Sequence, residues 1–219
     1  MSNCIPTVAW HRIGRALLLA GCLLAATGAA FAPWVERAPA ALVLTAPDLA
    51  EFVKFLPEVR AGTLVVDRLG FLLPLFGITF SLPFLVTAPW LACPAWVRRL
   101  GLAAVFPLAL TLLPPVWSPP VLLAEEFRLQ TMGCGFCVAL VIGSRWLHRL
   151  PRLSLLLVLP GLWGAAPVWA LWQFGIVQPA VARAYASPVV PGWGAYATCL
   201  GSALMLAGLV LSALPHRAR

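Results

Sequence analysis

Residues 153–174 read LSLLLVLPGLWGAAPVWALWQF, and this run contains no charged side chain. A helix needs about 20 mostly apolar residues to cross the hydrocarbon core of a bilayer. The run is therefore long enough and apolar enough to predict a transmembrane helix. Its tryptophans and prolines do not weaken this prediction, because both residue types occur in membrane helices more freely than charged residues do.

Five further stretches are similarly apolar and hold charged residues only near their ends, at 13–34, 69–91, 100–116, 129–146 and 194–214. The whole chain of 219 residues is 62% hydrophobic and only 10% charged, whereas a soluble domain carries roughly 25% charged residues. So little charge cannot cover the water-facing surface of a soluble protein of this size. The sequence predicts an all-α integral membrane protein in which residues 1–219 form one polytopic domain with about six transmembrane helices.

The first stretch also contains a pattern that resembles a processing signal. Leu19-Ala20-Gly21-Cys22 resembles a lipoprotein cleavage box. However, Arg15 leaves too few apolar residues before Cys22 for the hydrophobic region of a signal peptide, which needs roughly 7–15 residues. A retained first helix is therefore expected.

Charged residues are divided between alternate connecting segments. The first, third, fifth and seventh segments contain arginine but no acidic residue. The second, fourth and sixth together hold six basic residues and all seven acidic residues, which lie in the second and fourth. Because loops rich in arginine stay in the cytoplasm, both termini are predicted to be cytoplasmic, in a bacterial-type inner membrane. The sequence pI of about 10 then reflects topology, and no nucleic-acid partner is expected because the basic residues are dispersed over short loops. The arginines of the basic segments are Arg12, Arg15, Arg98, Arg99, Arg145, Arg149, Arg152, Arg217 and Arg219.

Most tryptophans lie near the predicted ends of the spans, as in the aromatic belts of membrane proteins. Trp34 and Trp117 are two of those assigned to the outer side. Their placement agrees with the topology that the arginines indicate.

Residues 35–68 form the longest polar connection and are expected on the outer side. Thr45 and Asp48 have the spacing of an N-terminal capping box,. The apolar residues Leu49, Phe52, Val53 and Leu56 then recur on one helical face,. This pattern predicts a short amphipathic helix over residues 46–56, whose apolar stripe rests on the bilayer or on the helix bundle.

The polar face of that helix allows a second interpretation, a lid or docking surface over a cavity. The candidate outer-surface contacts lie on this loop and on the next acidic segment. They are Asp48, Glu51, Lys54, Glu58, Arg60, Glu125 and Glu126.

Cys134-Gly135-Phe136-Cys137 forms a CxxC motif close to the outer end of the fourth span. These four residues resemble the motif of membrane thiol oxidases of the DsbB and vitamin-K-epoxide-reductase type, which pass electrons from a CxxC to a quinone. Those families also use a second, solvent-facing cysteine pair, and this chain has none. A thiol in an apolar span is also a poor nucleophile. Cys134 and Cys137 are therefore expected to be packing residues, with a redox pair as the alternative.

No cofactor or metal is expected, because no histidine lies on the side of these cysteines, and no nucleotide-binding motif is present,. No ionisable residue lies in the middle of a span, as ion-coupled transport usually requires. Prolines interrupt the second, third and fifth spans, so bent helices around an apolar cavity and close packing at small residues are both possible.

These observations favour a non-enzymatic membrane subunit, or a permease-like or interaction component, whose partners are the lipid bilayer and other membrane subunits. The alternative is a lipid- or quinone-handling enzyme or carrier that uses the bent helices and a redox pair of Cys134 and Cys137.

Overall fold

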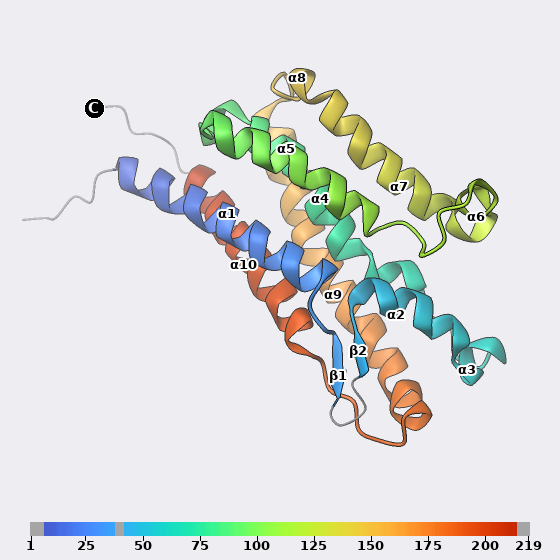
Figure 1. Ribbon diagram of the computed structural model, residues 1–219. Helices are drawn as coiled ribbons and strands as arrows, with labels where there is room; N and C mark the ends of the chain where they lie inside the picture. The colour runs from blue at the N-terminus through green and yellow to red at the C-terminus, as the bar shows by residue number, and fades with distance from the viewer. Residues whose placement is uncertain (1–6, 38–41, 214–219) are drawn as a thin grey trace, which may run out of the picture.

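A computed structural model describes residues 7–37 and 42–213 of the chain and is mostly helical (Figure 1). Its longer helices are α1 (Thr7–Ala30), α4 (Leu73–Thr87), α5 (Ala95–Leu110), α7 (Glu125–Ile142), α9 (Arg152–Ala184) and α10 (Trp193–Ala213). The shorter ones are α2 (Ala46–Phe52), η1 (Val53–Phe55), α3 (Pro57–Arg60), η2 (Arg68–Phe71), η3 (Pro89–Leu91), α6 (Pro119–Leu123) and α8 (Ser144–Leu147). Two short strands, β1 (Val35–Arg37) and β2 (Leu42–Leu44), complete the described elements.

Three helices of the described chain are long and apolar enough to cross a membrane, namely Trp10–Ala30, Arg152–Ala184 and Trp193–Ala213. They correspond to the first, fifth and sixth stretches predicted from the sequence. The apolar helix Leu73–Thr87 is shorter. The protein is thus a predominantly helical chain with the helices of a membrane protein.

The other three predicted stretches differ from the observed helices at their ends. The stretch 69–91 divides into η2, α4 and η3, and α4 ends where Ala88 becomes extended before Pro89, as residues before proline prefer. The stretch 100–116 corresponds to α5, which begins earlier, after Pro94, and ends at Leu110. The stretch 129–146 corresponds to α7, whose first turn contains Glu125 and Glu126. Prolines and charged first turns therefore set these boundaries.

Helices α1 and α10 run side by side, blue and red in Figure 1, and make the most extensive helix pair of the fold. Glycines seven residues apart on α1 face glycines seven residues apart on α10. A Cβ on Gly21 would lie 2.6 Å from the carbonyl oxygen of Gly201, and one on Gly28 would lie 2.7 Å from that of Gly194. Small residues at such a contact let two helix backbones approach closely. The first and last long helices of the chain are joined in this way.

The cap, defined here as residues 34–37 and 42–68, packs against the C-terminal part of α9 (Figure 1). Its strands pair antiparallel, with Val35 opposite Leu44. Trp34 is fully buried, donates its indole N–H to the carbonyl oxygen of Gly28 at 3.1 Å, and meets the Phe174 ring edge-on at 6.5 Å. The expectation that Trp34 belongs to an interfacial belt is therefore wrong, because its polar N–H already has a partner inside the protein.

The long helix α9 gives the cap its support. Its 33 residues correspond to about 50 Å at 1.5 Å per residue, whereas a hydrocarbon core is about 30 Å thick. The end of α9 lies beside the cap, where Phe52 stacks on Tyr185 at 5.7 Å and Arg183 pairs with Glu58 at 2.8 Å. The helix is thus longer than a hydrocarbon core is thick, and its C-terminal end reaches the cap.

The two ends of the molecule differ in charge. The start of α1, the start of α5, α8 and the end of α10 gather at the end opposite the cap (Figure 1). Arginines at that end bind main-chain carbonyls. Arg15 donates to the Ala92 carbonyl oxygen at 2.8 Å and Arg152 to the Ser212 carbonyl oxygen at 3.0 Å. All acidic residues belong to the cap or to residues 125–126 at the other end, so the chain has a basic end and a mixed, acid-containing end.

Candidate functional site: a charge cluster and an apolar pocket beside the cap

The N-terminus of α2 is fixed by the residues that the sequence indicates. The Thr45 hydroxyl accepts a hydrogen bond from the Asp48 N–H at 3.3 Å, and the Asp48 carboxylate accepts from the Thr45 N–H at 3.0 Å and from its hydroxyl at 2.7 Å. These reciprocal bonds form a complete capping box,. Asp48 is therefore occupied in holding the helix start.

The apolar stripe behind this box faces the protein itself. Leu49, Val53 and Leu56 are each at most 1% exposed. The α-helix ends at Phe52, one 3₁₀ turn continues to Phe55, and Leu56 is extended before Pro57. The helical segment is thus shorter than the range 46–56, because the residue before a proline leaves the helical region.

The polar side of the same segment contributes to a charge cluster, defined here as Glu51, Lys54, Arg68 and Glu126. The Lys54 ammonium lies 2.6 Å from Glu51 and 2.8 Å from Glu126, and Arg68 lies 3.1 Å from Glu51 and 3.8 Å from Glu126. Arg68 also donates to the main-chain carbonyl of Glu126. The cluster joins α2, η1, η2 and α7 and contains two cations and two anions.

An aromatic ring completes the cluster. The Phe127 ring lies 4.7 Å from the Lys54 ammonium and 4.9 Å from the Arg68 guanidinium, distances at which the ring face attracts cations. Two cations are thus held between carboxylates and an aromatic face.

The cluster shifts the titration of its members. The Lys54 hydrogen bond lowers the pKa of Glu126; partial burial opposes this shift, and the charges of Lys54 and Arg68 add to it, so the pKa lies below its usual value. Partial burial lowers the pKa of Lys54, but its bonds to Glu126 and Glu51 outweigh that effect and raise the pKa above its usual value. Both groups are thereby held in their charged forms.

The structure brings only some of the predicted surface residues together. Glu51, Lys54 and Glu126 meet in the cluster, whereas Glu58 pairs with Arg183. The pKa of the Glu58 carboxyl is lowered first by a hydrogen bond from its own main chain and then by the hydrogen bond from Arg183. Arg60 and Glu125 are exposed, and among the described residues neither forms an ion pair.

Sequence reasoning did not identify Arg68, the most buried member of the cluster. Its partners Glu51 and Glu126 lie 17 and 58 residues away in the sequence. No helical or strand spacing relates positions so far apart, so only the fold reveals the site.

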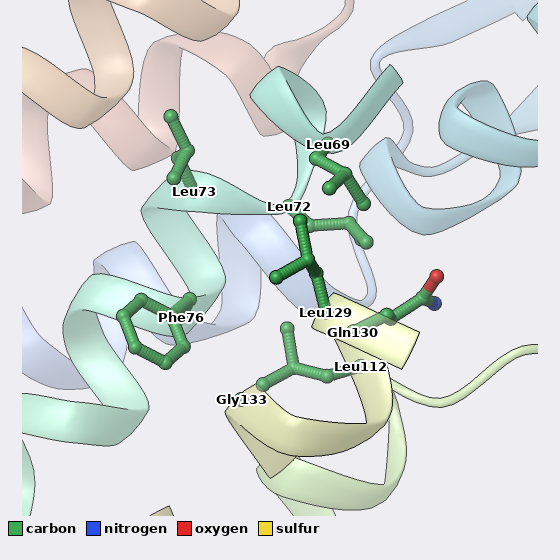
Figure 2. A pocket seen from close by; sticks show the side chains of 8 residues that line it. All are labelled: Leu69, Leu72, Leu73, Phe76, Leu112, Leu129, Gln130 and Gly133. Carbon is green, nitrogen blue, oxygen red and sulfur yellow. The ribbon is translucent and has the colours of Figure 1, made fainter. Parts of the chain in front are cut away.

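An apolar pocket with a cavity volume of about 210 Å³ lies next to the cluster, between η2, the start of α4, the end of α5 and α7 (Figure 2). It is lined by Leu69, Leu72, Leu73, Phe76, Leu112, Leu129, Gln130 and Gly133. Leu72 and Leu112 are buried, whereas Leu129 is 66% exposed and stands at the opening. An engineered apolar cavity of about 150 Å³ binds benzene, so this volume can take a ring or a segment of alkyl chain.

Gln130 is the one polar side chain in the lining of this pocket. It is only 8% exposed, and its Oε1 atom has no hydrogen-bond partner. In Figure 2 its amide points away from Phe76, toward the far edge of the pocket. A buried amide without a partner is costly, so native structures rarely contain one.

Gln130 also lines a second, larger crevice of about 700 Å³ beneath α2. Polar residues contribute to this crevice, among them Thr45, Asp48, Glu51 and Thr111. The end of α1 and β2 form its apolar wall through residues such as Phe31 and Val43. Gln130 thus stands between an apolar pocket and a partly polar crevice.

Cys134 and Cys137 lie on the buried face of α7, in register with Gln130. Both thiols are free. Within residues 7–37 and 42–213, no three histidine, cysteine or acidic side chains come together in an arrangement that could hold a metal ion. The structure places the two cysteines in the packing between helices, where they line neither the pocket nor the crevice.

No protein-family model matches the chain, and no curated protein and no solved structure shows significant similarity to it.

Proposed function

We propose that the protein is a multi-pass protein of a bacterial-type inner membrane, with six membrane segments that lie within α1, α4, α5, α7, α9 and α10 and leave the charged ends of these helices outside the apolar core. The basic end lies in the cytoplasm with both termini, and the cap lies on the outer side. The position of all acidic residues at the cap end, away from the arginines Arg15 and Arg152 at the opposite end, supports this orientation,. Helices α4 and α5 are short for a span, and a bilayer accommodates short helices by local thinning.

We further propose that the protein acts by binding, as a non-enzymatic membrane subunit or a permease-like interaction component. The carrying observation is that the cap is fixed to both α7 and α9, by the charge cluster and by the Arg183–Glu58 pair. This arrangement keeps a defined surface at the end of the bundle, on which Phe55 is 70% and Val65 is 86% exposed. Fixed apolar side chains on a pre-ordered surface suit contact with another protein, because little entropy is lost on binding.

Site-specific photo-crosslinking in intact cells tests this function. A photo-reactive residue at Phe55 or Val65 should give one discrete crosslinked band, and the tagged protein should co-purify with the same partner in constant ratio. The matched control is a photo-reactive residue at Leu157, which is 69% exposed on α9 and expected to face lipid. A crosslinking pattern that is the same at all three positions, or no protein adduct at either cap position, would contradict the proposal.

Lipid or quinone handling is the second candidate function. The specific observation in its favour is the pocket beside Gln130, which combines an apolar lining with one buried polar group that has no partner. A bound lipid or quinone that survives gentle purification would support it.

A further inference from the structure

We propose that the pocket and the crevice on either side of Gln130 form one binding site for an amphiphile whose uncharged or cationic head donates hydrogen bonds. The apolar chain lies in the pocket and the head lies in the crevice beneath α2. This inference deepens the lipid-handling candidate and rests on it.

The apolar half of the site is set by its lining. Apart from Gln130, the pocket contains only leucines, Phe76 and Gly133. Gly133 leaves room beside the Phe76 ring, since a Cβ at this position would already lie 3.4 Å from that ring. A pocket of about 210 Å³ admits part of one alkyl chain, and the exposed Leu129 at its opening lets the rest of that chain continue into the surrounding lipid.

The polar half presents hydrogen-bond acceptors. The Thr45 hydroxyl already donates its proton to Asp48, and the Thr111 hydroxyl donates to the Leu108 carbonyl oxygen at 2.8 Å. Both hydroxyl protons are therefore already used, so these two lining residues can offer a ligand only an acceptor oxygen,. Both Thr45 bonds go to Asp48 Oδ2, so the Oδ1 atom of that carboxylate is a further acceptor, as are the Glu51 carboxylate and the Oε1 atom of Gln130,.

Charge gives the site its selectivity. Asp48 and Glu51 both line the crevice, whereas the cations that neutralise Glu51, Lys54 and Arg68, are absent from its lining. A phosphate or carboxylate head would meet two carboxylates and no lining cation, so it is disfavoured. A hydroxyl or ammonium head can donate to Gln130 and to the carboxylates.

Gln130 connects the two halves. It is the residue that lines both cavities, and its side chain is buried without a partner for Oε1. A donor on the head of the ligand, near its junction with the chain, would satisfy this atom. The otherwise unexplained cost of burying the amide is then offset when the ligand binds.

Native mass spectrometry of the full-length protein in detergent tests the site. Three lipids with the same two chains serve as probes. Dioleoylglycerol has a hydroxyl as its head, dioleoylphosphatidylethanolamine has an ammonium beside a phosphate, and dioleoylphosphatidate has an anionic phosphate. The wild type should retain one molecule of dioleoylglycerol, whose hydroxyl lies directly beside the chains, as the preferred probe. Dioleoylphosphatidylethanolamine, whose phosphate separates the ammonium from the chains, should bind more weakly. Dioleoylphosphatidate should bind more weakly than the preferred probe.

Three variants locate the binding. Gln130→Leu should weaken retention about threefold to tenfold, as expected for the loss of one hydrogen bond in a buried site. Leu129→Trp should block the pocket opening without disturbing the core, since Leu129 is mostly exposed. Leu157→Trp, at an equally exposed position on α9, is the matched control and should bind like the wild type.

Two results would overturn the proposal. One is equal retention by the wild type, Gln130→Leu and Leu129→Trp, and the other is tightest binding of dioleoylphosphatidate. A further outcome separates the site from the function. If the lipid binds specifically in detergent but Leu129→Trp does not change the growth of cells that carry it, lipid handling is not the cellular function, although the binding site itself stands.

Discussion

Gly21 on α1 and Gly201 on α10 bring two helix backbones into contact, because a Cβ on Gly21 would lie 2.6 Å from the Gly201 carbonyl oxygen. The pairs Gly14–Gly208 and Gly28–Gly194 repeat the contact at intervals of seven residues. The first and the last long helices of the chain therefore depend on each other, although they are far apart in the sequence.

Substitution of Gly21 by valine should destabilise the fold. The valine side chain would meet the backbone of α10, which cannot move aside as a flexible side chain could, so a cost of at least roughly 1–3 kcal/mol is expected from overpacking. Unfolding of the purified protein in mixed detergent and SDS measures it. Gly161→Val on α9 is the control, because a Cβ there meets nothing within 4 Å, and equal losses in the two variants would argue against the glycine contact.

Replacement of Arg68 by glutamine should loosen the cap. Arg68 is only 14% exposed and pairs with both Glu51 and Glu126. Its removal leaves the partly buried Glu51 carboxylate with one cation fewer, which should lower the free energy of unfolding by about 1–2 kcal/mol. Limited proteolysis within residues 42–68 should become faster. Arg60→Gln, an exposed position without an ion pair among the described residues, should cleave at the wild-type rate.

The cluster should also weaken in acid. The Lys54 hydrogen bond lowers the pKa of Glu126 below its ordinary value of 4.5. The stability that this carboxylate contributes is therefore fully present above pH 4.5 and is lost as the pH falls through the lower folded-state pKa. A spin label at Phe55 should gain mobility as the pH falls from about 7 to below that value. Glu126→Gln should remove most of this response, and an unchanged acid transition in that variant would assign it to other groups.

The predictable parts of this structure are local. The capping box of Thr45 and Asp48 and the stripe of Leu49, Val53 and Leu56 are separated by three or four residues, and such spacings report a helix directly. The three long apolar runs that correspond to α1, α9 and α10, the helices long enough to cross a membrane, are equally local signals.

The remaining features depend on contacts between distant residues. The pairing of Arg68 with Glu126 crosses 58 residues, and the β1–β2 hairpin lacks a recognisable two-residue turn sequence. Trp34 could be assigned to a membrane interface only because its partners Gly28 and Phe174 were unknown. The glycine contact did leave a signal, since Gly14, Gly21 and Gly28 share the spacing of Gly194, Gly201 and Gly208, but spacing alone does not identify which helices meet.

The topology can be tested by labelling. A cysteine introduced at Glu51 should react with an impermeant maleimide added to intact cells, and a cysteine at Arg217, which lies outside the described residues, should react only after lysis. The reason is that arginine-only segments stay in the cytoplasm. Native cysteines are first replaced by serine, and a variant without introduced cysteine sets the background. The reverse labelling pattern would invert the orientation and place the cap in the cytoplasm.

Cys134 and Cys137 should prove to be structural. Both are buried on α7, at 7% and 0% exposure, and a reactive thiol needs access and a nearby cation or base to form the thiolate. Replacement of both by alanine should therefore leave cellular abundance nearly unchanged and cost about 1–2 kcal/mol through lost packing, measured by unfolding in SDS. The opposite result has a clear signature. If each single variant lost the cellular function as completely as the double variant, and the native protein contained a reducible bond between the two sulfurs, the pair would act as one redox unit. The resemblance of the motif to membrane thiol oxidases would then describe chemistry, and the binding function proposed for the cap would have to give way to it.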